Sequence, residues 1–193
     1  MLAVTGYRSK IVEELRKLLP AHEKVVRCDE LADWTADSYL FCAGLLRPKT
    51  LLHQTKEEIE ESIWVNLLSP MQLCDSVLKR NDKARICVMG SESGFSWSHD
   101  GAYAAAKAAL HRYVETKKIG PHQQLVCVAP SIIEDAQMTL RRQDTDNLER
   151  RRQAHPKQRF LKAVEIARLI HFLLYVDEGY VSGTVIRVHG GPA

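Results

Sequence analysis

The chain has 193 residues, of which 45% are hydrophobic and 26% charged, and its formal net charge is +3. This composition is typical of a globular protein, and the length predicts one domain with a substantial core, spanning residues 1–193. The small net charge does not favour nucleic-acid binding, and no apolar run is long enough to predict a membrane span.

Five cysteines are scattered along the chain, at positions 28, 42, 74, 87 and 127. Their number is odd and none forms a C-x-x-C pair, so we expect reduced, mostly buried thiols rather than a disulfide framework or a zinc site. The opening residues MLAVTGY show no basic, apolar leader. These features together predict a cytoplasmic protein without a metal centre.

Short apolar runs alternate with helical patterns. Strands are predicted at residues 2–6, 24–28, 38–44, 84–90, 124–130 and 183–191. Helices are predicted at 10–19, 55–79, 103–118 and 163–175, with Pro70 kinking or dividing the second and a solvated helix at 141–153. This order predicts an α/β fold with a doubly wound parallel sheet of about six strands. In such sheets, ligands bind beyond the carboxyl ends of the strands.

A tyrosine and a lysine stand four residues apart in GAYAAAKAAL. This spacing puts the Tyr103 phenol and the Lys107 ammonium on one face of the predicted helix. A cation beside a phenol lowers the phenol pKa, so Tyr103 could exchange a proton with a carbonyl or alcohol oxygen. Taken alone, such a pair is more often a half-buried aromatic beside a solvated lysine.

Two further polar residues extend this pair. Ser91 follows the strand predicted at 84–90, where its hydroxyl could bind a substrate oxygen or simply form a turn. Asn66 lies inside a predicted helix, which asparagine disfavours, and this indicates a specific partner such as a buried water.

Two strand ends have the small residues of a ligand site. Thr5 and Gly6 make a tight turn into a helix whose N-terminus could face a phosphate. Ala43 and Gly44, after the third strand, would let a ligand come close to the backbone.

In this order, the motifs resemble the short-chain dehydrogenase/reductase family over nearly the whole chain. They are VTG at 4–6, CAG at 42–44, Asn66, Ser91, Tyr103 with Lys107, and the ending SGTVIRVHGG. The resemblance implies a Rossmann-like fold and hydride transfer between NAD or NADP and a small carbonyl or alcohol substrate.

The resemblance also implies roles for individual residues. Tyr103 would be the general acid/base, Lys107 would lower its pKa and bind the nicotinamide ribose, and Ser91 would orient the substrate oxygen. Asn66 would hold the water of a proton relay. The implied cofactor contacts are Thr5, Gly6, Arg8, Lys10, Ile11, Asp29, Ala43, Gly44, Tyr103, Lys107 and Pro130.

The first turn departs from the family pattern TGxxxGxG. The sequence TGYRSKIV has Lys10 and Val12 in place of the second and third glycines, which permit close approach to a pyrophosphate and tight helix packing. Lys10 could meet the phosphate with its charge, or Arg8 and Lys10 could be solvated loop residues.

The segment after the second strand is short. Asp29 would accept hydrogen bonds from the ribose of NAD, whereas Arg8, Lys10 and Arg27 point toward NADP, and the balance favours NAD. Only fourteen residues separate Asp29 from Gly44. We therefore expect one edge strand of the family to be missing and its helix to be reduced to a turn.

Several expectations concern substrate and partners. Residues 132–160 fall where the family places its substrate-covering loop, and their charge suits a polar substrate or a solvated lid. His99 could line the pocket or be a solvated loop residue. The helices at 55–79 and 103–118 are those the family uses for subunit contact, so we expect a homodimer or homotetramer.

Two functions are open at this point. One is a nicotinamide-dependent dehydrogenase or reductase acting on a carbonyl/alcohol pair. The other is a nucleotide-binding or scaffold protein that keeps the fold with weakened catalysis, as the altered glycine turn and the short segment after Asp29 indicate. The presence of Ser91, Tyr103, Lys107 and Asn66 together favours the first.

Overall fold

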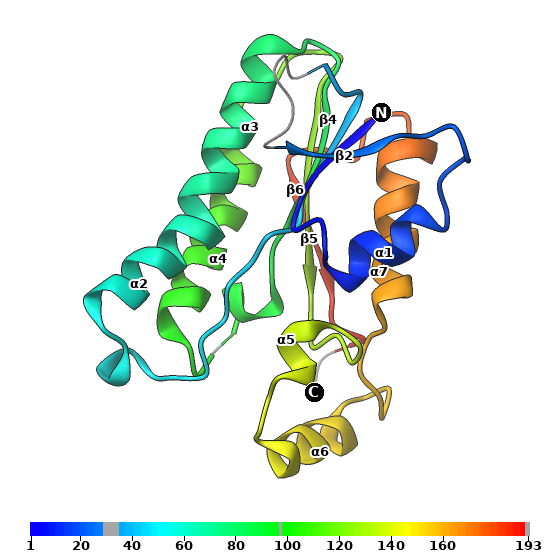
Figure 1. The fold of residues 1–193 in the computed structure, drawn as a ribbon. Helices are drawn as coiled ribbons and strands as arrows, with labels where there is room; N and C mark the ends of the chain where they lie inside the picture. The colour runs from blue at the N-terminus through cyan, green and yellow to red at the C-terminus, as the bar shows by residue number, and fades with distance from the viewer. Residues whose placement is uncertain (29–34, 97, 192–193) are drawn as a thin grey trace.

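A computed structural model describes residues 1–28, 35–96 and 98–191. One sheet of six parallel strands, in the order β2-β1-β3-β4-β5-β6, forms the centre of the molecule (Figure 1). The strands are β1 (Leu2–Thr5), β2 (Val25–Arg27), β3 (Ser38–Phe41), β4 (Arg85–Met89), β5 (Gln124–Pro130) and β6 (Thr184–Val188). Each lies within a run predicted as a strand, so the expected parallel α/β fold is confirmed. In the part of the chain that the structure describes, β2 is the edge of the sheet, in agreement with the predicted loss of an edge strand.

Helices cover both faces of the sheet (Figure 1). On one face, α1 (Lys10–Arg16) packs against α7 (Ala163–His171). On the other lie α3 (Ser69–Arg80) and α4 (Gly101–Thr116), with α2 (Lys56–Ile63) leading into α3. The other described helices are η2 (Leu51–His53), η3 (Trp64–Leu68), η4 (Glu92–Gly94), α5 (Gln137–Leu140), α6 (Thr145–Ala154) and η5 (Phe172–Val176).

Alternate residues of the strands pack into two separate cores. Leu2 and Val4 of β1 join the core under α1 and α7, whereas Ala3 joins the core under α3 and α4. This follows from the two-residue period of a strand. Because both faces are covered, the strands are apolar at almost every position, which is why the sequence shows continuous apolar runs. All five cysteines are thiols outside any disulfide bond, and four of them are buried, as expected.

The predicted division at Pro70 is a change of helix type. Pro70 lies in the first turn of α3, where its missing N–H is tolerated. The five residues before α3 form the π-helical segment η3, with Asn66 at its middle. The helical run expected at 55–79 is therefore α2, η3 and α3 in succession.

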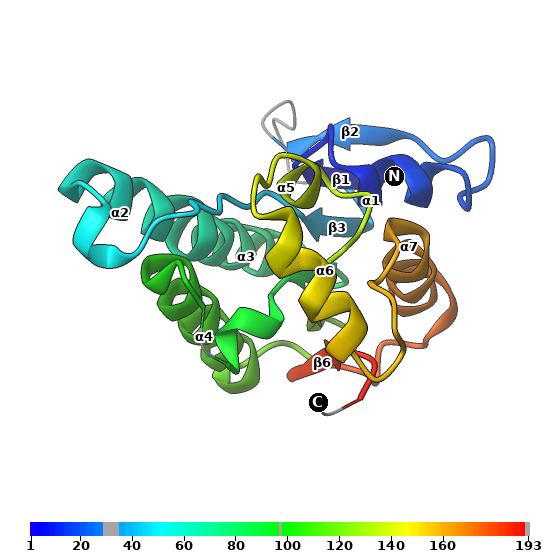
Figure 2. The ribbon, with the colours of Figure 1, turned by 90° about the horizontal axis from the view of Figure 1, so that it is seen from below.

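The carboxyl ends of the strands face α5 and α6 (Figure 2). Both helices belong to the segment 132–160, and α6 has no buried residue, so the expectation of a solvated helix there is confirmed. Among the residues described, no helix is long and apolar enough to cross a membrane.

Candidate active site

Tyr103 lies in the first turn of α4, near the carboxyl end of β4. The helix begins there because Asp100 caps it: its Oδ1 accepts a hydrogen bond from the backbone N–H of Tyr103 at 3.0 Å. The alanines that follow have a high helix propensity and carry only small side chains. The Tyr103 side chain is buried at this end of the sheet.

Ser91 lies two residues after the end of β4 and is the N-cap of η4. Its Oγ accepts the backbone N–H of Ser93 at 3.2 Å, which fixes the turn. Its side chain also interacts with the phenol of Tyr103, and this interaction acts to lower the phenol pKa. The structure thus brings together the two residues expected to handle the substrate oxygen.

The pKa of the Tyr103 phenol is raised above its ordinary value, so the expectation that Lys107 lowers it is wrong for this structure. Burial is the main cause, the charge of Asp100 adds to it, and the interaction with Ser91 opposes it. The Lys107 Nζ is 5.8 Å from the centre of the Tyr103 ring and donates to the backbone carbonyl of Met89 at 2.7 Å. The phenol is therefore held neutral, the form that can give a proton to a carbonyl oxygen.

Lys107 is a buried cation. Burial lowers the pKa of its ammonium to about 8. Together with Thr5, Ala43 and other residues, Lys107 lines a cavity of about 10 Å³, which has room for about one water. Three of the residues expected to contact the cofactor therefore meet at one point between the first turn and α4.

The turn after β1 has the geometry that the sequence predicts. Gly6 has φ = +65°, and a Cβ on it would lie 2.8 Å from the backbone of Cys42 and Ala43, so only glycine fits. Thr5 Oγ1 accepts the Ala43 N–H at 3.1 Å. The ends of β1 and β3 are thus held in direct contact.

The start of α1 differs from a phosphate-binding turn. Lys10 Nζ lies 2.6 Å from Glu13 and 3.1 Å from Glu14 on its own helix, which favours the surface alternative over a phosphate contact. Arg8 is exposed. The side chains of Ile11 and Val12 are buried in the core with α7. The predicted contact of Ile11 with a cofactor would therefore be made by its backbone.

Asn66 fastens the loop after β3 to η3. Its Nδ2 donates to the carbonyls of Leu45 at 2.8 Å and Ser62 at 2.9 Å, and its Oδ1 accepts the Leu45 N–H at 3.1 Å. These bonds explain why an asparagine stands inside a helix. Its role in holding a water stays a prediction.

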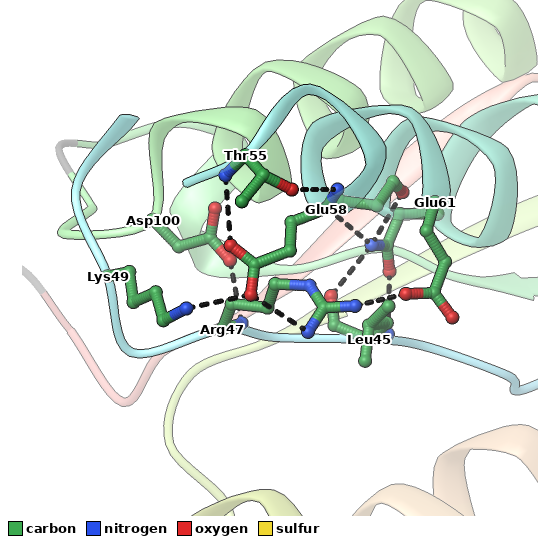
Figure 3. Close-up of polar contacts among 9 residues, drawn as sticks. Leu45, Arg47, Lys49, Thr55, Glu58, Glu61 and Asp100 are labelled. Carbon is green, nitrogen blue, oxygen red and sulfur yellow. Dashed lines mark hydrogen bonds and ion pairs between the residues drawn. The ribbon is translucent and has the colours of Figure 1, made fainter. Parts of the chain in front are cut away.

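Asp100 fastens the other part of this loop, a feature that the sequence analysis missed. Its Oδ2 accepts the Arg47 N–H at 2.8 Å and its Oδ1 accepts Gln54 Nε2 at 2.9 Å, besides the N–H of Tyr103. Asp100 is only 1% exposed. Figure 3 shows the loop's ion pairs, Arg47 with Glu58 and Glu61, and Lys49 with Glu58. An aspartate three residues before Tyr103 was the available signal, as the pattern of an N-cap.

The remaining predicted residues lie around this centre. Met138 of α5 covers Gly44, because a Cβ built on Gly44 would lie 3.1 Å from the Met138 Cε. The segment 132–160 therefore reaches the loop after β3, where a ligand is expected. Pro130 ends β5 and is buried, whereas His99 and Arg27 are exposed. Asp29 lies outside the described residues.

Comparison with known proteins agrees with this geometry. A family model described as "Enoyl-(Acyl carrier protein) reductase" matches residues 10–192. MabA of Mycobacterium tuberculosis, named as a 3-oxoacyl-acyl-carrier-protein reductase, is 32% identical over 157 residues, which are 77% of this chain and 62% of MabA. Carbonyl reductase 2 of Sus scrofa, whose name specifies NADPH, is 26% identical over 210 residues, 99% of this chain and 85% of the relative.

The fold has close counterparts among solved structures. An oxidoreductase of the short-chain dehydrogenase/reductase family from Burkholderia thailandensis has a TM-score of 0.80 and 21% identity, covering 98% of this chain and 91% of that one. The chain spans less than two thirds of the length of MabA, yet the family match extends over almost all of its own residues. The chain therefore belongs to the short-chain dehydrogenase/reductase family.

Proposed function

We propose that the protein transfers hydride between a nicotinamide cofactor and a carbonyl/alcohol pair, with Tyr103 as general acid/base. The observation that carries this proposal is that the Ser91 side chain interacts with the Tyr103 phenol beside the carboxyl end of β4. Two hydroxyls so placed can both bond one substrate oxygen. The Lys107 ammonium lies one helical turn further along α4.

In the direction of reduction, Ser91 orients the carbonyl oxygen and Tyr103 gives it a proton. When bound, a nicotinamide cofactor supplies the hydride to the carbonyl carbon. The neutral state of the buried phenol suits this step. In the direction of oxidation Tyr103 must take a proton as phenolate, and the interaction with the Ser91 side chain stabilises that form.

The residues around the small cavity support cofactor binding at this edge. The Gly6 turn, Ala43 and Gly44 would hold the cofactor backbone, and Lys107 would hold the nicotinamide ribose. Asp29 favours NAD and the exposed Arg8 and Arg27 favour NADP; we propose NAD as the preferred cofactor. The altered start of α1, with Lys10 paired on its own helix, makes binding weaker than a glycine-rich turn would allow.

The substrate is proposed to be a ketone or its alcohol. MabA is named for 3-oxoacyl groups and the Sus scrofa relative for carbonyl reduction, and both names describe a ketone or aldehyde carbonyl. A small 3-oxo ester such as ethyl acetoacetate is a suitable first probe.

Cofactor binding is expected to raise the thermal stability of the protein. A ligand that binds only the native state at a hundred times its Kd adds about 2.7 kcal/mol to the free energy of unfolding. Titration with NAD, NADH, NADP and NADPH should give the larger increase in Tm with the first two. Lys107→Met should reduce this increase. If none of the four cofactors raises the Tm, the proposal is contradicted.

A further inference from the structure

His111 lies on α4, one turn beyond Lys107 and two beyond Tyr103, and is 4% exposed. Its Nε2 accepts the backbone N–H of Ser91 at 3.3 Å. A ring nitrogen that accepts carries no proton, so the neutral imidazole has its proton on Nδ1. Within the part of the chain that the structure describes, that Nδ1 is buried and has no partner. The hydrogen bond from the Ser91 N–H therefore fixes the orientation of the His111 ring.

The loop that carries Ser91 is shaped around this ring. A Cβ on Gly90 would lie 2.5 Å from Nε2 of His111, and a Cβ on Gly94 would lie 2.5 Å from its Cε1. Phe95 stacks on the ring, with centroids 4.5 Å apart and planes at 28°. The imidazole therefore fills the space between α4 and the segment Gly90–Phe95, and glycine is required on both sides of Ser91.

The groups around His111 keep it neutral. Burial lowers its pKa to about 4; Lys107 and Arg187 act in the same direction and Glu92 opposes them. Cys127 of β5 lies close by, and burial raises the pKa of its thiol to about 12, so it is neutral as well. A second proton on His111 would point Nε2–H at the N–H of Ser91, two donors facing each other, and would break the bond.

We propose that His111 is a positioning residue for the reaction: its unprotonated Nε2 holds the Ser91 backbone so that the Ser91 hydroxyl meets Tyr103. This inference rests on the proposed function, because it takes Ser91 as the group that orients the substrate oxygen. His111 acts through Ser91 and does not touch the substrate. Its hydrogen bond thereby connects the loop after β4 to the middle of α4, next to the Ser91 and Tyr103 hydroxyls.

Two substitutions separate the acceptor from the volume of the ring. His111→Phe keeps a flat ring against Phe95 but removes the acceptor, whereas His111→Gln keeps an acceptor oxygen. In ¹⁵N-labelled protein, the Ser91 amide signal should lose its hydrogen-bonded shift in His111→Phe and regain it in His111→Gln. In the wild type, the His111 ring should stay neutral one pH unit below the ordinary histidine pKa of about 6.5.

The kinetic arm uses ethyl acetoacetate with the cofactor that binds. His111→Phe should lower kcat by about tenfold to a hundredfold, as for a displaced reacting group, without changing the cofactor KM; His111→Gln should recover most of it. His122→Phe is the surface control. A Ser91 amide signal unchanged in His111→Phe, or a His111 ring charged at that pH, overturns the inference. Absence of turnover in the wild type contradicts the proposed function instead, and the amide signal still decides the role of His111.

Discussion

Tyr103→Phe is expected to lower kcat for carbonyl reduction by about a hundredfold to ten-thousandfold, the usual contribution of a general acid. The substitution removes only the hydroxyl that the substrate oxygen would need. The ring remains in its buried place at the start of α4, so cofactor binding should persist. The measurement is steady-state kinetics on ethyl acetoacetate beside a thermal-shift titration of the same variant.

The control for this substitution is Tyr180→Phe, because Tyr180 is 97% exposed. It should leave kcat unchanged. If Tyr103→Phe keeps the wild-type kcat while its folding and cofactor binding are intact, Tyr103 is not the acid of this reaction. Scaffold function with weakened catalysis, the second hypothesis from the sequence, would then regain support.

Asp100→Ala is expected to lower the free energy of unfolding by about 3 kcal/mol or more. The buried carboxylate accepts from the N–H of Tyr103, the N–H of Arg47 and Gln54 Nε2. Each buried donor left without a partner costs about 1–3 kcal/mol, and a lost helix cap about 1 kcal/mol. Chemical denaturation measures the loss, with the exposed Asp82→Ala as the control.

Asp100→Asn separates the charge of this residue from its hydrogen bonds. The amide oxygen can still cap α4, while its NH₂ group faces the N–H of Arg47, so the stability loss should be smaller than for alanine. The Asp100 charge raises the pKa of Tyr103. Its removal lowers that pKa, and the basic limb of the reduction profile, which needs the protonated phenol, should move to lower pH. If the basic limb does not move, the charge of Asp100 does not affect the pKa of Tyr103 in the reaction.

The strands and the catalytic pair were predictable from local sequence. Continuous apolar runs mark strands that are buried on both faces, and all six lie where those runs are. Tyr103 follows β4 by one short loop, so its meeting with Ser91 follows from the parallel fold.

The pKa of Tyr103 was not predictable in the same way. The spacing of Tyr103 and Lys107 gives their common helix face, but burial and the partner of the ammonium depend on the whole fold. His111 and Asp100 were missed for a related reason. Each is defined by contacts with a distant loop, and no period in the sequence shows which loop packs there.

The oligomeric state and the role of Asp29 stay predictions. Ala105, Ala108 and Ala109 lie exposed on α4, where a partner helix could approach closely, and the expected homodimer or homotetramer rests on that face. The role of Asp29 in choosing NAD rests on the sequence. The sequence left open whether Lys10 binds a phosphate or lies on the surface. In the structure, its ammonium forms ion pairs with Glu13 and Glu14.

Transfer of an isotopic label tests hydride transfer most directly. The protein is incubated with ethyl acetoacetate and NADH or NADPH carrying deuterium at the reactive position of the nicotinamide, and the product is analysed by mass spectrometry. We expect one deuterium on the carbon that bears the new hydroxyl, at a rate that Tyr103→Phe lowers by at least about a hundredfold. Cofactor binding without any labelled alcohol, from this probe or a panel of ketones, would contradict the account.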